Sequence, residues 1–295
     1  MACVTLDIEP DLCGYAVDPG APRYYGLFDD DRQFARFTEL LSRHGVSLTC
    51  FVVGTVFRDR PDHLRELERL GAEFGSHSMT HDLDAQDQQS EILGGIEAFE
   101  RFFGHVPRGY RAPFFRLTRT LLETLDRSGV AYDSSYMPSV SPISPGVYRN
   151  LRGPSLPFRW QGLSLVELPL ATIRHVRLPI GPSYLKVLGR TVFRLARKTL
   201  GYPDPLVTFV HPMNLIYSPQ AFEQLPFRWK LANSRNRFRG MDLLDWFLLH
   251  LHQAGYRFLP MSELYESVME AELQEIPLPG SERHRHHRQQ GVEAR

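Results

Sequence analysis

Residues 43–51, Arg-His-Gly-Val-Ser-Leu-Thr-Cys-Phe, lead from the end of an amphipathic helix through a glycine directly into an apolar strand. The same order of helix, glycine and strand recurs around Gly71, Gly129 and Gly255. Glycine is favoured just after a helix because that position commonly requires a positive φ angle. Short helix-to-strand turns that repeat in this way predict a parallel sheet wound with helices, as a barrel or as an open sheet.

Hydrophobic patterning outlines the other elements, because short apolar runs predict strands and apolar residues three and four apart predict helices. The expected strands are Ala2–Ile8, Val46–Val53, Ala72–Gly75, Gly129–Asp133, Leu165–Leu168, Leu206–His211 and Tyr256–Leu259. The expected helices are Arg32–His44, Asp87–Phe103, Thr118–Ser128 and Asp242–Gln253. Functional groups of a wound parallel sheet gather at the carboxyl ends of its strands.

Composition excludes several classes of protein. Hydrophobic residues make up 42% of the 295 positions, which suffices for a continuous core and argues against global disorder. The 34 Lys and Arg balance the 34 Asp and Glu, so the chain lacks the basic excess of a nucleic-acid-binding protein. No apolar run approaches the roughly 20 residues that cross a bilayer. The first ten residues lack the features of a secretory signal.

The cysteines and two irregular stretches complete the outline. Cys3, Cys13 and Cys50 are too few for a disulfide framework, so we expect reduced thiols and a cytoplasmic protein. Tyr136–Trp160, rich in proline, serine and glycine, is expected to be a surface excursion. We expect residues 1–274 to form one catalytic domain, followed by a disordered tail at 275–295 whose histidines are merely solvated.

Two acids close the first strand, in Val-Thr-Leu-Asp-Ile-Glu at residues 4–9. Alternation along a strand points Asp7 and Glu9 to one side, at the end where a site is expected. Neighbouring carboxylates repel each other unless a cation or a proton relieves the repulsion. The plain structural alternative is that one of the two acids caps the next loop.

His77 and His81 form a second candidate cluster. Their spacing points both imidazoles the same way on a helical turn, and imidazole is a common ligand of zinc and neighbouring transition metals. Taken alone the pair is a weak signal, because such pairs also arise by chance. The segment also lacks the glutamate of the helical zinc-protease motif, so a base must come from elsewhere.

Three more polar residues are expected at strand ends. Arg111 lies in Arg-Gly-Tyr-Arg-Ala-Pro, and a guanidinium beside a stiff proline turn suits bidentate pairing with a carboxylate. His211 and Asp133 each end an apolar run. Taken singly, the three are equally compatible with structural roles: a surface arginine, a satisfied core histidine and a loop cap.

In this order the segments resemble the motif series of the polysaccharide deacetylases, carbohydrate esterase family 4. The resemblance spans roughly residues 2–266. It rests on Thr-Leu-Asp-Ile-Glu at 5–9, Leu-Thr-Cys-Phe-Val-Val-Gly at 48–54, Gly-Ala-Glu-Phe-Gly-Ser-His-Ser-Met-Thr-His at 71–81, Arg-Gly-Tyr-Arg-Ala-Pro at 108–113 and Val-Thr-Phe-Val-His at 207–211. The form of the first motif, Tyr-Asp-Ser-Ser at 132–135 and the arginine-rich residues 234–240 look most like the branch associated with bacterial exopolysaccharide assembly.

The resemblance implies an α/β fold, a distorted TIM-like (β/α) barrel of about seven parallel strands. It also implies an enzyme that removes acyl groups from sugars with a divalent metal, zinc in the first place, with cobalt, manganese, nickel and iron as alternatives. The implied roles are general base for Asp7, partner of that base for Arg111, general acid for His211 and metal ligands for Glu9, His77 and His81.

Two motifs depart from the family's usual form. The commonest first motif has adjacent aspartates followed by glycine, whereas Ile8 separates Asp7 from Glu9 here and Pro10 follows. The aspartate–tryptophan motif is absent in its usual form, and Asp133 is assigned in its place to orient His211.

The leading hypothesis is a hydrolase that removes an N-acetyl or N-formyl group from an amino sugar in polysaccharide or lipid-linked glycan biosynthesis. Water would attack directly, because no serine or cysteine lies in a nucleophile motif. Two alternatives stay open: a hydrolase of a non-sugar amide or cyclic imide on the same fold, and an inactive carbohydrate-binding domain. The intact set of candidate residues argues against the inactive domain.

Two basic stretches flank His211. Ser183–Leu200 is amphipathic with several lysines and arginines, and Leu225–Gly240 adds arginines and aromatic residues. Basic charge with exposed aromatics suits an anionic or interfacial substrate, such as a sugar on a polyprenyl diphosphate at the inner membrane face. An ordinary helix with a solvated charged face is the plain alternative. No feature of the sequence indicates an oligomeric state.

Overall fold

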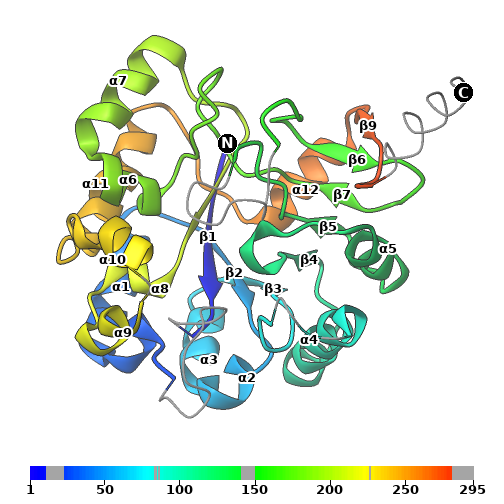
Figure 1. The fold of residues 1–295 in the computed structure, drawn as a ribbon, viewed down its shortest axis with the longest axis horizontal. Coiled ribbons are helices and arrows are strands. Elements are labelled where there is room, and N and C mark those ends of the chain that lie inside the picture. Colours follow the sequence, from blue (N-terminus) through cyan, green and yellow to red (C-terminus); the bar gives the residue numbers. More distant parts are fainter. Residues whose placement is uncertain (11–22, 83–84, 86, 141–149, 226, 281–295) are drawn as a thin grey trace, which may run out of the picture.

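The structure is a computed structural model that describes residues 1–10, 23–82, 85, 87–140, 150–225 and 227–280 (Figure 1). Its strands form one sheet in the order β8-β1-β2-β3-β4-β5-β7-β6-β9. The strands are β1 (Ala2–Ile8), β2 (Leu48–Val52), β3 (Glu73–Ser76), β4 (Gly109–Tyr110), β5 (Tyr132–Asp133), β6 (Phe158–Trp160), β7 (Val166–Glu167), β8 (Leu206–Val210) and β9 (Glu275–Ile276).

The run from β8 to β7 is parallel at every described pairing, and β6 then pairs antiparallel with β7. The expected α/β fold with about seven parallel strands is therefore confirmed. The sheet also curls: beyond β7, the Ala171 N–H donates a 2.8 Å hydrogen bond to the carbonyl of Val207 in β8. This contact brings the two ends of the parallel run together and gives the sheet its distorted barrel form.

Helices surround this sheet in Figure 1. The α-helices are α1 (Asp31–Arg43), α2 (Val56–Asp59), α3 (Pro61–Arg69), α4 (Gln88–Phe103), α5 (Arg119–Arg127), α6 (Pro182–Leu188), α7 (Arg190–Leu200), α8 (Pro212–Leu215), α9 (Pro219–Gln224), α10 (Phe227–Ser234), α11 (Gly240–His252) and α12 (Met261–Met269), with short 3-10 turns at Gly26–Asp29 and Pro113–Phe115. No helix in the described part of the chain is both long and apolar enough to cross a membrane.

Local signals explain where the helices begin and end. The side chains of Asp30 and Thr118 accept hydrogen bonds from the first backbone N–H groups of α1 and α5, as N-caps do. Gly45 and Gly129, which follow those two helices, have φ angles of +58° and +77°. The α1 face with apolar residues at helical spacing is buried in the core, so sequence pattern and packing agree.

Several expected elements differ in the structure. Tyr256–Leu259 is not a strand, since Phe258 makes only an isolated bridge to Ala2. The amphipathic stretch 183–200 breaks into α6 and α7 at Gly189, whose φ of +83° interrupts helical geometry.

The expected surface excursion is also partly wrong, because Phe158–Trp160 is strand β6 with Phe158 and Trp160 buried. Residues 141–149 at its centre lie outside the described residues. Glu275–Ile276, where the tail was expected to begin, pairs with β6 as β9. The rest of that tail, 281–295, and Cys13 are likewise outside the described residues, and the domain limits stay a prediction.

Candidate functional site

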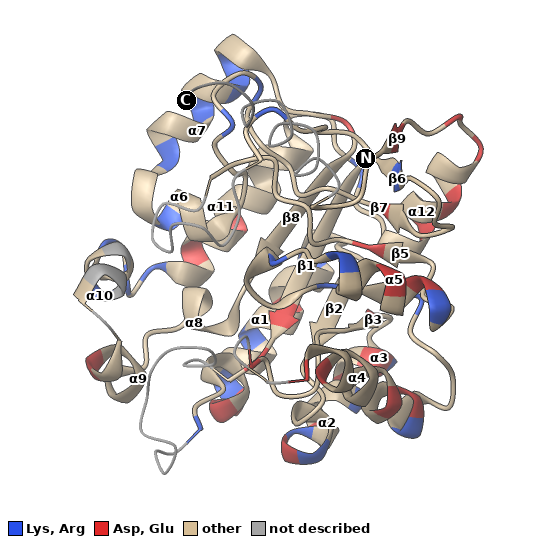
Figure 2. Cartoon of the chain, turned by 45° about the vertical axis from the view of Figure 1, so that its right-hand side comes forward, with Lys and Arg blue, Asp and Glu red and all other residues tan. Residues whose placement is uncertain are grey.

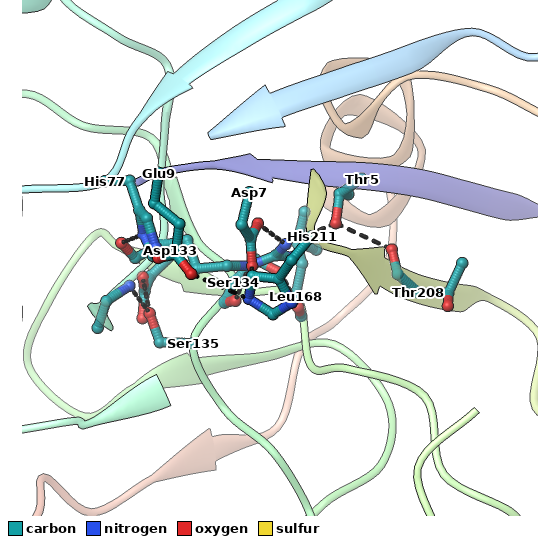
Figure 3. Close-up of polar contacts among 12 residues, drawn as sticks. Thr5, Asp7, Glu9, His77, Asp133, Ser134, Ser135, Leu168, Thr208 and His211 are labelled. Atoms are coloured by element: carbon teal, nitrogen blue, oxygen red, sulfur yellow. Dashed lines mark hydrogen bonds and ion pairs between the residues drawn. The ribbon is translucent and has the colours of Figure 1, made fainter. Parts of the chain in front are cut away.

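The carboxyl ends of four parallel strands carry the candidate residues. Asp7 lies on β1 and Glu9 just beyond it, the His77–His81 segment follows β3, Arg111 follows β4 and His211 follows β8. All these strand ends lie at one edge of the sheet, because parallel strands point the same way. Figure 3 shows Glu9 beside His77, and Asp7 beside His211.

Glu9, His77 and His81 form a compact cluster. Nε2 of His81 lies 2.7 Å from Oε2 of Glu9, and Nε2 of His77 lies 3.4 Å from the same oxygen. One nitrogen or oxygen of each residue lies within 4.8 Å of the others. Two imidazoles and one carboxylate at this separation match the ligand set of a zinc-type ion with open positions.

The His77 ring is fixed by a backbone contact. Its Nδ1 lies 2.7 Å from the carbonyl oxygen of Arg111, which can only accept a hydrogen bond. Nδ1 therefore carries a proton, and Nε2 is directed toward Glu9. Contacts of this kind orient the histidine ligands of metal sites.

Opposing effects act on the protonation of this cluster. Burial raises the pKa of Glu9, but the positive charge of His81 and hydrogen bonds from both histidines hold it well below its ordinary value. Burial lowers the pKa of His77, and the hydrogen bond with Glu9 and the charge of Asp7 outweigh this and raise it. The cluster thus favours a charged Glu9, the form that ligates a cation.

The histidine segment is not the helical turn expected from its spacing. It is a loop in which Ser78 and His81 have positive φ angles of 66° and 67°. Backbone contacts hold this conformation, since the N–H groups of Gly54 and Thr55 donate to the carbonyls of Ser78 and Met79 at 2.9 and 3.1 Å. The two imidazoles therefore meet because of loop geometry and its supports, not because of helical periodicity.

Helix α4 supports the same loop from outside. The carboxylate of Glu91 accepts hydrogen bonds from the backbone N–H and the hydroxyl of Thr80 at 3.0 and 2.7 Å. Gly95 lets the helix approach, because a Cβ at this position would lie 2.5 Å from the backbone carbon of Ser78. The segment after Arg111 also contains backbone strain, because Phe114 and Phe115 have positive φ angles of 51° and 59°. Strained residues of this kind cluster at functional sites.

Asp7 and Arg111 form a buried ion pair behind the cluster of Glu9, His77 and His81. Nη1 of Arg111 lies 2.6 Å from Oδ1 of Asp7, and both side chains are almost completely buried. The guanidinium also donates to the Thr5 hydroxyl and, through Nε and Nη2, to the carbonyl and hydroxyl of Ser134. It stacks 4.3 Å from the centre of the Phe51 ring. Arg111 is thus held rigidly, and it holds Asp7 in turn.

The other oxygen of Asp7 is available for chemistry. Oδ2 has no hydrogen-bond partner among the described residues and lies 3.7 Å from Nε2 of His211. The same nitrogen lies 3.6 Å from Oε1 of Glu9. His211 is 22% exposed, whereas Asp7 is 1% exposed, so the imidazole lies at the solvent side of the cluster. Oδ2 of Asp7 and Nε2 of His211 therefore face a common space beside the cluster of candidate metal ligands.

Asp133 ends strand β5 at the same edge of the sheet, where Figure 3 labels it among the other candidate residues. Its Oδ1 accepts a 2.6 Å hydrogen bond from the Ser135 hydroxyl, and among the described residues it forms no hydrogen bond or ion pair with His211. The Ser135 hydroxyl in turn accepts from the backbone N–H of Ala112, next to Arg111. These contacts connect Asp133 to the loop that carries Arg111, and its catalytic role stays a prediction.

Glu167 is the partner of Asp133 that sequence reasoning missed. Its Oε1 accepts from the backbone N–H groups of Ser135 and Tyr136, and its Oε2 from Trp160 Nε1 at 3.2 Å. Burial raises the pKa of Asp133 to about 6 and that of Glu167 well above its ordinary value. Glu167 therefore keeps its proton at pH values where an exposed glutamate has lost it. An acid inside the apolar run 165–168 was the available signal.

Comparison with known proteins gives matches in sequence. Residues 16–132 match a family model described as polysaccharide deacetylase. The peptidoglycan deacetylase-like protein FGM2 of Gibberella zeae is 30% identical over 116 residues, 37% of this chain and 34% of that protein. A chitooligosaccharide deacetylase of Sinorhizobium fredii is 32% identical over 120 residues, 38% of this chain and 56% of that protein. The chain thus covers between about a third and just over half of these relatives.

The fold also matches solved structures. A putative polysaccharide deacetylase from Mycobacterium smegmatis superposes with a TM-score of 0.57 at 22% identity, covering 94% of this chain and 92% of the other. BA3943 of Bacillus anthracis, described as a CE4 family pseudoenzyme, superposes with a TM-score of 0.50 at 13% identity, covering 94% and 67%. At these identities the likeness concerns the fold alone.

Proposed function

We propose that this chain, whose residues 16–132 match the polysaccharide deacetylase family model, is a metal-dependent hydrolase that removes the N-acyl group of an amino sugar. The convergence of Glu9, His77 and His81 beside the Asp7–Arg111 pair carries this proposal. A pseudoenzyme with the same fold shows that fold alone does not establish catalysis, so the intact residues matter.

The donor set fits a divalent ion. Glu9, His77 and His81 would hold it, with Nε2 of His77 aimed at the cluster by the Arg111 carbonyl. A bound zinc or related ion supplies polarisation of an acyl carbonyl and a lowered pKa of water. The carboxylate and imidazole chemistry favours zinc, cobalt, nickel, manganese or iron over calcium.

Proton transfer would be divided between Asp7 and His211. Asp7 Oδ2 is free to take a proton, and Arg111 orients the carboxylate through Oδ1. His211 lies within 4 Å of both carboxylates and at the solvent side, where it can deliver a proton to the departing sugar amine. A base and an acid facing one space are what hydrolysis of an amide requires.

We also propose an N-acetylated or N-formylated sugar of an oligosaccharide or lipid-linked glycan as the substrate, within polysaccharide biosynthesis and the cytoplasm. The matched chitooligosaccharide deacetylases support the sugar amide as substrate class. The two described cysteines, Cys3 and Cys50, are free and buried, and burial raises the pKa of both thiols. Unpaired thiols are typical of proteins in a reducing compartment.

Acetate or formate release from a panel of acylated oligosaccharides and lipid-linked sugars tests this proposal. Asp7→Asn should lower kcat/KM on the order of a hundredfold or more, because it removes the proton acceptor. Asp31→Asn, at a fully exposed acid of α1, is the matched control and should leave the rate unchanged. Release from small amides or cyclic imides alone would reassign the substrate. Stoichiometric metal content without any turnover would indicate an inactive domain.

A further inference from the structure

The region from α6 to the end of the α10 segment has an uneven charge. Residues 186–239 contain ten Lys and Arg against two acids, Asp204 and Glu223, although the whole chain is balanced. Figure 2 shows the basic residues of α6, α7 and α10 along one side of the molecule. We call the exposed side chains of α6, α7 and residues 227–239 the basic apolar face.

Helix α7 has apolar residues on its outer side as well as its inner side. Phe193 packs in the core, as expected for an amphipathic surface helix. Val192 and Leu195, on another side of the helix, are 40% and 60% exposed, next to the exposed Arg194. A helix whose outer side faced only water would not need this second apolar pair.

Residues 227–239 also combine exposed apolar side chains with arginine. Phe227, Leu231 and Phe238 are 79%, 66% and 72% exposed, which makes them among the most exposed large apolar side chains described. Arg237 stacks on the rings of Tyr217, Phe222 and Phe238, at 4.8 Å from the first and last. Exposed aromatics beside arginine are typical of side chains that enter a lipid interface.

Several described cations of this face form no ion pair with a carboxylate of the described residues. Lys230 lies 3.5 Å from Glu223, but within the described ranges Arg194, Lys198, Arg235 and Arg239 form no ion pair with a carboxylate. Free cations beside unburied apolar groups indicate an external partner with both anionic and apolar character.

We propose that the basic apolar face docks on an anionic lipid bilayer. A soluble polyanion would satisfy the cations but would leave Leu195, Phe227 and Phe238 in water. A bilayer with anionic headgroups satisfies both kinds of side chain, with each cation adding about 1 kcal/mol to binding.

The face is directly connected to the candidate site. The hydroxyl of Ser183 in α6 lies 2.6 Å from Oδ1 of Asn214 in α8, and that oxygen also accepts from the backbone N–H of His211 at 3.3 Å. Asn214 thus links helix α6 of this face to the loop that carries His211. The use of this arrangement for a lipid-linked sugar rests on the proposed function, whereas the docking itself does not.

Co-sedimentation of the whole protein with phosphatidylcholine vesicles, with and without phosphatidylglycerol, tests docking. We expect binding only to the anionic vesicles, weakened by salt. The double variant Arg194→Glu/Lys198→Glu should weaken binding about thirtyfold or more, from two lost cations. Leu195→Ser/Phe238→Ser should weaken binding with its salt dependence retained. Arg69→Glu/Arg101→Glu, on α3 and α4, is the matched control and should bind as the wild type does.

Three outcomes would overturn the proposal: no binding to anionic vesicles, equal loss in the control variant, or binding to dextran sulfate without binding to vesicles. The last result would identify a surface for soluble polyanions. Thermal unfolding of each variant separates lost docking from misfolding. Acetate release from a soluble chitooligosaccharide should be unchanged in the three surface variants, so failure of docking and failure of catalysis give distinct results.

Discussion

Arg111 and Arg194 place the same guanidinium in opposite settings. Arg111 is fully buried and bonded to Asp7, Thr5 and Ser134, whereas Arg194 is exposed and forms no ion pair with a carboxylate in the described part of the chain. A buried charge without partners costs several kcal/mol, while an exposed one remains hydrated. Buried charges of this protein therefore fix the positions of groups, and the exposed ones are free to attract a partner.

Replacing each arginine by methionine should give the largest difference in the free energy of unfolding. Arg111→Met leaves Asp7 buried without its cation, and should lower the free energy of unfolding by about 3–5 kcal/mol. Arg194→Met retains most of the aliphatic side chain and should change the free energy of unfolding by less than about 0.5 kcal/mol. Urea unfolding measures both. Equal stability of the two variants would show that the ion pair does not anchor the site.

Gly94 and Gly95 are adjacent in α4 but differ in how closely the histidine loop packs against them. Gly95→Ala drives a methyl group into the backbone of Ser78 and should cost about 1–3 kcal/mol while weakening zinc binding. The methyl group of Gly94→Ala would lie 3.3 Å from Cβ of Met79, a contact that a shift of a few tenths of an ångström relieves, so this change should cost less. Thermal unfolding and zinc titration of both variants test this. A similar effect of the two changes would mean that α4 does not hold the histidine loop.

The buried acid pair predicts a smaller, pH-dependent effect. Because the pKa of Asp133 is about 6 in the folded protein against 3.8 ordinarily, the folded state binds more protons than the unfolded state between these values. The stability contributed by the pair is thus fully present below about pH 4 and is lost as the pH rises through 6.

Glu167→Gln removes one titrating carboxyl from this pair. The free energy of unfolding of the variant, minus that of the wild type, should therefore rise between pH 4 and pH 7, by at most about 1.4 kcal/mol per pH unit. Glu97→Gln, at an exposed position of α4, should give a flat difference. A pH-independent difference for Glu167→Gln as well would contradict the raised pKa of Glu167.

Elements with strong local patterns were predictable. The strand Ala2–Ile8 is observed with the expected limits, and α5 begins after the expected capping threonine, because alternation, burial and capping act within a few residues. Elements that depend on pairing with distant segments could not be predicted from the sequence. Phe158–Trp160 becomes a strand because Glu167 and Ile276 lie on strands beside it, and no local pattern shows those neighbours.

In the candidate site, too, some features follow from local sequence and others depend on distant segments. Strand alternation predicted that Asp7 and Glu9 point to one side, and in the structure His211 lies within 4 Å of both. The histidine spacing suggested a helical turn, but the segment is a strained loop held by Gly54, Thr55 and α4. The Asp133–Glu167 pair arises because β5 and β7 are neighbours in the sheet, a relation between segments more than 30 positions apart.

By itself, the chain's order of residues determined the wound parallel sheet, the edge at which chemistry would gather and the residue types available there. Periodicity, capping and glycine turns are local properties, and strand direction then follows from connection length. Only the tertiary structure decided that Nε2 of His77 and His81 face one Glu9 oxygen, that Arg111 occupies one oxygen of Asp7 and leaves the other free, and that α7 exposes leucine beside arginine. Distances between side chains from different strands depend on how the sheet curls and how its helices pack, and no short stretch of sequence contains that information.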